Sequence, residues 1–376
     1  MSITSYHSID NTLDESSVDY ASLSKLKGII SNYRKDELST PLDEKHILKW
    51  LHQFNDADQD IILHETIHIF ESWYFTKVDM IDFLKKVVLF LQKNLGFSSQ
   101  IDVYMNCVFS NNQQNGESQN ALIRMLSEIA SEKYSEIRNT VRKDDRFVVY
   151  VDDGLYSGNR AIKDIENLIK TVPLGSTIYA FYFCATSFGI DNVQDKLNLL
   201  AEQRSVTIKI FRNKIIENQI FTQKDYAAEM CEESYFPIHK CLWPSIVDLQ
   251  QPEAIEQINY FQNKSGTKEI YYRNNVWLND KGVFSSLKNR NIVEKAFLLK
   301  GIEIYQYCSA TSGLYPLGKG NCSTFGTGTF CAFENNISNT CPLALWWGNI
   351  EPKGNILDKW YPLLPRRVDE KSESAF

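Results

Sequence analysis

The residues best suited to chemistry in this 376-residue chain are two adjacent acids, Asp152 and Asp153. They follow residues 147–151, whose unbroken apolar run predicts a buried strand. In an open α/β sheet, ligands bind at the carboxyl ends of the strands. Two carboxylates at that position can accept hydrogen bonds from the hydroxyls of a ribose. They can also stabilise positive charge that develops at an anomeric carbon.

The loop after the acids has the composition of an anion-binding turn, with the residues Tyr156, Ser157, Gly158, Asn159 and Arg160. It leads into a helix that the apolar positions 162, 165 and 169 predict. The unpaired N–H groups and the dipole of a helix N-terminus favour a phosphate, and Gly158 lets the backbone approach closely. A diol at one end and a phosphate at the other describe a ribose 5-phosphate. An ordinary acidic turn after a buried strand is the alternative interpretation.

The segment from Val148 to Arg160 resembles the phosphoribosyl pyrophosphate motif of type I phosphoribosyltransferases. That motif is a hydrophobic strand, two acids, three residues, and then Thr or Ser, Gly, any residue and Thr. The resemblance implies that Asp152 and Asp153 bind the ribose hydroxyls, that the loop 156–160 holds the 5-phosphate, and that Mg²⁺ bridges ribose and diphosphate oxygens. Two features depart from the pattern: Arg160 stands in place of the final Thr, and residues 110–117 contain no Lys or Arg.

A narrower likeness covers islands between residues 42 and 365. The segments 50–54, 152–159, 317–321 and 339–347 resemble the phosphoribosyltransferase-like proteins of bacterial anti-phage defence systems. This resemblance implies an effector or component that works beside a protein partner. We expect the ligand to be phosphoribosyl pyrophosphate or a nucleotide, with transfer or cleavage at C1. A non-catalytic nucleotide sensor on the same fold is the alternative.

A second motif, His-Glu-x-x-His at residues 64–68, offers a different chemistry. On a helix, His64 and His68 share a face and can bind zinc, as in metalloproteases, where the glutamate between them activates water. Glu71 lies on the same helical face as a third oxygen donor. A zinc hydrolase is therefore a distant alternative, and a half-buried structural helix is the other interpretation of these residues.

Apolar periodicity predicts an α/β fold with a doubly wound, mostly parallel sheet of the phosphoribosyltransferase type, because strands and helices alternate between residues 100 and 215. Strands are expected at 101–109, 147–151, 177–184 and 206–211. The tail adds predicted strands at 301–307 and a late strand or flap at 342–347. We expect a polar arm at 1–40, a helical layer at 41–96, the core at 97–215, and a strand-rich C-terminal extension at 216–376 packed on that core.

Charge and composition exclude several classes of function. The formal net charge of -7 argues against binding to duplex nucleic acid. The first residues lack the basic and apolar regions of a signal peptide, and no run approaches the ~18 apolar residues that span a bilayer. Eight cysteines without an export signal are expected to be reduced thiols in a cytoplasmic protein.

Overall fold

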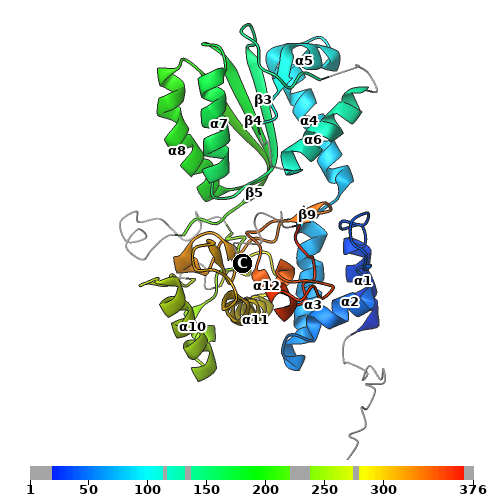
Figure 1. Cartoon of the computed structure of the whole chain (residues 1–376), viewed down its shortest axis with the longest axis vertical. Helices are drawn as coiled ribbons and strands as arrows, with labels where there is room; N and C mark the ends of the chain where they lie inside the picture. Colours follow the sequence, from blue (N-terminus) through cyan, green and yellow to red (C-terminus); the bar gives the residue numbers. More distant parts are fainter. Residues whose placement is uncertain (1–18, 113–116, 132–136, 221–237, 274–278, 368–376) are drawn as a thin grey trace, which may run out of the picture.

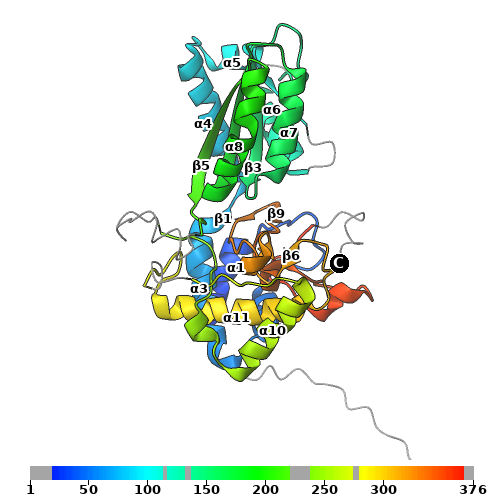
Figure 2. The same cartoon turned by 90° about the vertical axis from the view of Figure 1, so that its left-hand side faces the viewer.

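Two lobes are stacked along the long axis of the molecule in the computed structural model, which describes residues 19–112, 117–131, 137–220, 238–273 and 279–367 (Figure 1). The sheet lobe, residues 77–216, holds the parallel sheet. The helical lobe is built from residues 19–76 together with 238–367, so both ends of the described chain contribute to it. Figure 2 shows that the strands run toward the helical lobe. The carboxyl ends of the strands therefore lie between the lobes.

Four parallel strands form the sheet in the order β2-β3-β4-β5. Their bounds are β2 Cys107–Phe109, β3 Phe147–Leu155, β4 Thr177–Thr186 and β5 Thr207–Ile216. The predicted parallel sheet is confirmed, and three of its four strands begin within one residue of the predicted position. Apolar and β-branched runs form β2, β3 and β4, which are largely buried, whereas the edge strand β5 is exposed or half-buried along most of its length.

Helices cover both faces of the sheet. On one face lie α4 (Lys77–Leu95), α5 (Gln100–Asn106) and α6 (Glu117–Ser131), and on the other lie α7 (Asn159–Thr171) and α8 (Ser187–Gln203). The side chains of β3 alternate between the two cores, with Val149 and Val151 on the α4 side and Val148 and Tyr150 on the α7 side. Because α6 and α7 depart to opposite faces, the loops that follow β2 and β3 diverge at the carboxyl end of the sheet, where ligands bind in such folds.

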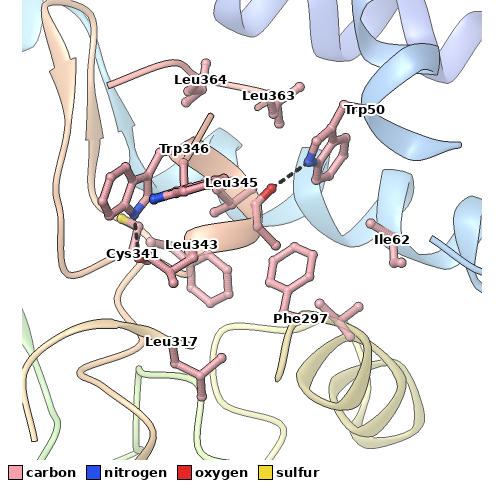
Figure 3. Packing of buried hydrophobic residues seen from close by; sticks show 14 of the residues in the cluster. Trp50, Ile62, Phe297, Leu317, Cys341, Leu343, Leu345, Trp346, Leu363 and Leu364 are labelled. Atoms are coloured by element: carbon pink, nitrogen blue, oxygen red, sulfur yellow. Dashed lines mark hydrogen bonds between the residues drawn. The ribbon is translucent and has the colours of Figure 1, made fainter. Parts of the chain in front are cut away.

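The helical lobe has a single large core. Its helices are α1 (Tyr20–Ile30), α2 (Glu44–Leu51), α3 (Asp56–Trp73), α10 (Pro252–Ser265), α11 (Leu287–Tyr305) and α12 (Leu343–Trp346). Figure 3 shows Trp50 of α2 donating its indole N–H to the carbonyl of Ala344, at 2.8 Å. The ring of Phe297 on α11 lies beside Trp50, with the ring centroids 6.5 Å apart. The indole N–H of Trp346 is likewise bonded to the carbonyl of Cys341. The buried tryptophans therefore tie the N-terminal helices to the C-terminal segment.

Short strands and 3-10 turns complete this lobe. Strand β1 (Tyr74–Phe75) is parallel to β8 (Ala332–Phe333), which also pairs with β9 (Asn336–Ile337), and β6 (Leu314–Tyr315) pairs with β7 (Gly318–Lys319). The 3-10 turns are η2 (Ile246–Leu249), η4 (Cys322–Thr324) and η5 (Ile356–Lys359). Pairing of β1 with β8 fixes the end of α3 beside the C-terminal segment.

Several predictions of strand are wrong. Residues 100–106 are α5, because Ser99 and Asp102 form a capping box that starts a helix, and only 107–109 are strand. Residues 301–305 continue α11, and Gly301 is needed there because a Cβ would stand 2.4 Å from the Pro316 carbonyl oxygen. The segment 342–347 contains the short helix α12. The described C-terminal part is therefore helical with two-residue strands, and the prediction of a strand-rich extension is wrong.

The N-terminal segments divide between the lobes. Residues 1–18 of the expected polar arm lie outside the described residues, and residues 20–30 form α1, whose apolar side joins the core of the helical lobe. Helix α4 ends at the predicted glycine, Gly96, whose φ of 69° is left-handed. It covers the sheet, whereas α2 and α3 belong to the helical lobe. Across the described residues, none of the helices combines the length and apolarity needed to cross a membrane.

His46 makes the stability of the helical lobe depend on pH. Its Nε2 donates to the carbonyl of Leu363 and its Nδ1 accepts from the Tyr361 hydroxyl, both at 2.8 Å, so the neutral ring is fully bonded. Burial lowers the pKa of His46 from 6.5 to about 4. The unfolded chain therefore binds more protons between these values, and stability falls as the pH drops from 6.5 toward 4, by about 3 kcal/mol in all from this group.

We expect His46→Gln to remove this part of the pH dependence. Urea unfolding of the wild type and the variant at pH 7.5 and pH 5 measures it. The free energy of unfolding should fall more steeply in the wild type than in His46→Gln. Equal losses in both proteins would show that His46 does not titrate with unfolding. The exposed His52 provides a matched control, because His52→Gln should leave the wild-type pH dependence unchanged.

Candidate functional site at the carboxyl end of β3

Asp152 and Asp153 lie inside β3, because that strand continues beyond the predicted end at Val151. Asp152 is in register with Tyr182 of β4, and the pairing runs on to Leu155 opposite Ala185. Successive side chains of a strand point to opposite faces. The two acids therefore sit at the predicted edge of the sheet but in different surroundings.

Asp152 is buried and hydrogen-bonded. The hydroxyl of Ser118, at the start of α6, donates to its Oδ1 over 3.1 Å. The Tyr150 hydroxyl lies 3.2 Å from its Oδ2 and 3.0 Å from Oδ2 of Asp164 on α7. The backbone N–H of Asp153 also donates to Asp152, at 2.9 Å. This carboxylate fixes the loop after β2 to the end of β3, since it joins α6, β3 and α7.

Asp153 is half-buried and opens on a cavity of about 220 Å³ between the lobes. Burial raises the pKa of its carboxyl, and the hydrogen bond with Asp152 and the positive charge of Arg366 oppose that rise. Of the two acids, Asp153 is the one whose surroundings disfavour the charged form. A ligand that donates hydrogen bonds to it would lower this cost.

Both lobes line that cavity. The sheet lobe contributes Asp153 and residues of α4 and α6, and the helical lobe contributes the α1–α2 connection and the turn between β8 and β9. Its charged lining residues besides Asp153 are Arg34, Lys35, Asp36, Glu37, Lys77 and Glu334. No sequence pattern marks most of these residues, because they lie on segments far from the motif. Only the capping-box pattern at residues 76–79, which starts α4, could have placed Lys77 at a helix start.

The predicted phosphate loop, residues 156–160, runs along the surface beside the start of α8. The Ser157 carbonyl accepts from the Asn192 side chain at 2.7 Å, and the Tyr156 carbonyl accepts from the Thr186 hydroxyl. Ser157, Asn159 and Arg160 are exposed. The loop and Asp153 are therefore on the same edge of the sheet, but the loop does not line the cavity on which Asp153 opens.

The side chain of Tyr156 is turned away from this loop. Its ring lies against Gly154, where a Cβ would stand 2.4 Å from the ring. Burial beside the thiols of Cys331 and Cys184 raises the pKa of the Tyr156 hydroxyl well above its usual value. Among the predicted phosphate-binding residues, Tyr156 thus offers only its backbone.

Gly158 begins α7 in the left-handed conformation, with φ of 79°. No side chain caps this helix start, and the only bond there is a weak one of 3.5 Å from the Asn159 N–H to the Ser157 hydroxyl. A Cβ at Gly158 would lie 2.8 Å from Cγ2 of Val193 and 3.0 Å from the carbonyl oxygen of Gly189. An uncapped helix start with a close-packed glycine has the properties of an anion-binding turn.

The histidine motif does not assemble a metal site. The Nε2 atom of His64 lies 3.1 Å from the Ser22 hydroxyl, His68 is exposed, and Glu71 pairs with Lys25 at 2.6 Å. No group of three or more His, Cys, Asp or Glu side chains that could hold a metal is found in the part of the chain that the structure describes. The glutamate of the motif has a structural role instead.

That glutamate, Glu65, is buried and joins α3 to the start of α11. It accepts hydrogen bonds from the Ser285 N–H at 2.9 Å and from the Asn289 side chain at 2.7 Å. A carboxylate at a helix N-terminus interacts favourably with the unpaired N–H groups and the helix dipole.

Replacement of Gly158 by alanine should destabilise the protein by about 1–2 kcal/mol, because of the left-handed backbone and the contacts that a Cβ would make. Chemical denaturation measures this loss. Gly266→Ala is the matched control: its φ is 69° and no atom lies within 4 Å of the added Cβ. A loss no greater than that of the control would show that the turn at Gly158 is not tightly packed.

The two acids should differ in their effect on stability at pH 7. Asp153→Asn should raise the free energy of unfolding, because burial disfavours the charged carboxylate. Asp152→Asn should lower it by about 1–2 kcal/mol, because an amide cannot accept all the bonds that Asp152 accepts. Thermal unfolding of both variants measures this difference, and equal losses in both would contradict it.

Comparison with known protein families identifies the family of this chain. No curated protein matches the chain. The family model PRTase-CE matches residues 47–366, from α2 to the end of the described helical lobe, and so includes both lobes. The match covers most of the chain, and the chain belongs to the PRTase-CE family, a phosphoribosyltransferase-like family.

Proposed function

We propose that the chain binds a ribose 5-phosphate compound, either phosphoribosyl pyrophosphate or a nucleotide, at the carboxyl end of β3 and transfers or cleaves at its C1 carbon. The observation that carries this proposal is the order of Asp152, Asp153 and the uncapped α7 start at Gly158 along one edge of a parallel sheet. Membership of a phosphoribosyltransferase-like family supports it.

The acids would serve the ribose end of the ligand. Asp153 stands on the wall of a cavity, where its carboxylate can accept hydrogen bonds from ribose hydroxyls. Reaction at C1 develops positive charge in an oxocarbenium-like transition state, and a nearby carboxylate stabilises that charge most strongly where water is excluded. Asp152 holds the backbone and α6 in place around Asp153 through its bond to Ser118.

The loop at residues 157–160 would serve the phosphate end. The free N–H groups at the start of α7 can donate to phosphate oxygens, and the exposed guanidinium of Arg160 can replace the hydroxyl contact that the family motif makes at this position. Thr186 and Asn192 hold the carbonyls of Tyr156 and Ser157, which fixes the loop beside the start of α7.

The residues present fit a magnesium ion that is bound mainly through the ligand. Mg²⁺ usually keeps several waters and takes one or two protein carboxylates together with substrate phosphates. Asp153 and Glu334 both line the cavity and provide such oxygens. When bound, the ion would neutralise negative charge on a diphosphate leaving group.

We further propose that the protein acts in bacterial anti-phage defence, as an effector or component beside a protein partner. The resemblance of the motif and tail segments to proteins of such systems supports this role. This proposed role does not alter the reaction that we propose at the carboxyl end of β3.

A nucleotide sensor without turnover is the second candidate. In transferases of this kind a loop after the first strand helps to hold diphosphate, and here its described residues are Ser110, Asn111 and Asn112, without a cation. The Ser110 hydroxyl is bonded to Asn112, at 2.5 Å, rather than open to a ligand. A ligand that binds and is recovered unchanged after prolonged incubation would favour the sensor over the transferase.

Calorimetric titration of phosphoribosyl pyrophosphate and nucleoside monophosphates with Mg²⁺ tests the proposal. We expect binding to the wild type, and a loss of roughly tenfold or more in the variant that combines Asp152→Asn with Asp153→Asn. Asp195→Asn, which changes an exposed acid on α8, is the matched control and should bind normally.

The pH dependence of binding provides a second criterion. If the charged form of Asp153 accepts the ribose hydroxyls, affinity should fall on acidification with a midpoint above 3.8, the usual value for aspartate, because burial raises the pKa of this carboxyl. Equal affinity in the wild type and the double variant would overturn the proposal.

A further inference from the structure

A second cavity, of about 270 Å³, lies in the helical lobe and carries an excess of positive charge. It is formed by the α1–α2 connection, the segment after α12 and the end of the described chain. Among the described residues that line it, four are cationic and two are acidic: Arg34, Lys353, Arg366 and Arg367, with Glu37 and Glu351. The cavity therefore has a formal excess of two positive charges.

Its two acids are already engaged. Glu37 faces two guanidiniums, because it accepts from Nε of Arg34 at 2.8 Å and from Nε of Arg367 at 3.2 Å. Glu351 accepts two hydrogen bonds at 2.7 and 2.6 Å from the hydroxyls of residues 39 and 40. Neither acid is left over to balance the remaining cations.

Arg366 has no carboxylate of its own. The guanidinium is partly buried, donates to the carbonyl of Ile337 and lies 5.9 Å from the ring centroid of Trp346. Across the described residues, no acidic oxygen stands within 4.0 Å of it. Burial lowers the pKa of Arg366, which shows the cost of the charge in this position. A desolvated cation without an acidic partner indicates an anion that completes the site.

Two further features of this cavity are an indole N–H without an acceptor in the described part of the chain and a backbone in the left-handed conformation. The indole Nε1 of Trp347, a side chain only 1% exposed, finds no hydrogen-bond acceptor among the described residues. Arg34 has a left-handed backbone with φ of 45°, which is unfavourable for any residue with a Cβ. Such conformations cluster at ligand clamps. The cavity therefore has an unsatisfied donor in the described part of its wall and a backbone conformation that the surrounding structure must hold in place.

We propose that this cavity binds a small phosphate-bearing anion between the guanidiniums of Arg34 and Arg366. Arginine is suited to this because its planar group donates paired hydrogen bonds to phosphate oxygens. The site adjoins the cavity on which Asp153 opens, because Arg34 and Glu37 line both, but the inference does not rest on the proposed reaction at β3.

The anion site and Asp153 influence each other through Arg366. The two cavities share Arg34 and Glu37 in their walls, and the positive charge of Arg366 favours the charged form of Asp153. An anion bound at Arg366 would repel the Asp153 carboxylate. Binding at one site should therefore weaken binding at the other, and this effect is reciprocal.

Calorimetric titration with inorganic diphosphate, in buffer without divalent metal, tests the site. We expect binding to the wild type and a loss of roughly tenfold or more in Arg366→Gln, because a charge-assisted hydrogen bond is removed. Lys353→Gln should weaken binding by roughly two- to fivefold. Arg212→Gln, which makes the same change on an exposed arginine of β5, is the control and should bind like the wild type.

If Arg366→Gln does not fold, Lys353→Gln still tests the proposal, because Lys353 is exposed and its replacement should leave the fold intact. Parallel titrations with inorganic phosphate and adenosine monophosphate distinguish an inorganic anion from a nucleotide. The ligand that binds most tightly of the three identifies the source of the phosphate. No binding of any of them to the wild type, or equal affinity in the wild type and both cavity variants, would overturn the proposal.

The variant with both Asp152→Asn and Asp153→Asn separates this site from the proposed function. In the diphosphate titration this variant should bind at least as tightly as the wild type, because a nearby negative charge is removed. Its binding of a ribose 5-phosphate compound at β3 should be lost. Weaker diphosphate binding in this variant would place the anion at β3 and refute a separate site.

Discussion

A cluster of four phenylalanines joins the two lobes, and the position of every group at the carboxyl end of the sheet depends on it. The ring of Phe75 lies 4.8 Å from that of Phe183 and 5.4 Å from that of Phe333, and Phe83 lies 5.4 Å from Phe183. Three of these residues come from β1, β4 and β8, and the fourth is on α4. Each buried side chain contributes roughly 1.5–3 kcal/mol. Because β1 pairs with β8, the cluster brings the C-terminal segment against the sheet, next to Asp153.

Burial at this edge gives the two acids different tasks. Asp152 accepts hydrogen bonds from groups on α6 and β3, and so its charge stabilises the local structure. Asp153 is held beside a cavity where its charge is opposed by burial and supported by a distant arginine. A functional group that is unfavourable in the folded state persists only where the surrounding packing holds it in place. Two adjacent residues of a sequence motif can thus have different roles: one stabilises the structure, and the other is available to a ligand.

The elements with strong local signals could be predicted from the sequence. Apolar runs located β3 and β4, a mixed run rich in β-branched residues located β5, and α4 ended at Gly96, the predicted end of the helical layer. The length of β3 could not be predicted, because Asp152, Asp153 and Gly154 disfavour strand and only the pairing with β4 extends it. Gly301 resembled the start of a strand, although close contact with Pro316 explains it within a helix.

The charged groups around the candidate site were also beyond sequence analysis. Arg366 lies near the end of the described chain, outside any motif, and is partly buried at the cavity in the helical lobe. Arg34 and Arg366 are 332 positions apart, yet the carbonyl of Pro365 accepts a hydrogen bond from Arg34. No local pattern marks such a pair, since only the shared core of α1–α3 and the C-terminal segment brings them together. The residues that could be found were those of a contiguous motif, and the missed ones were those that tertiary packing assembles.

The construction of the helical lobe from both ends of the chain has a consequence for biosynthesis. On the ribosome, α1, α2 and α3 emerge first, but their core partners α11, α12 and residues 363–364 emerge last. The sheet lobe in between pairs strands that follow one another along the chain, and it can fold as a unit while the apolar faces of the first helices are still uncovered. The edge of the sheet that carries Asp153 is covered only after the segment around β8 and β9 has been made. The candidate site is therefore completed well after the sheet that carries its acids.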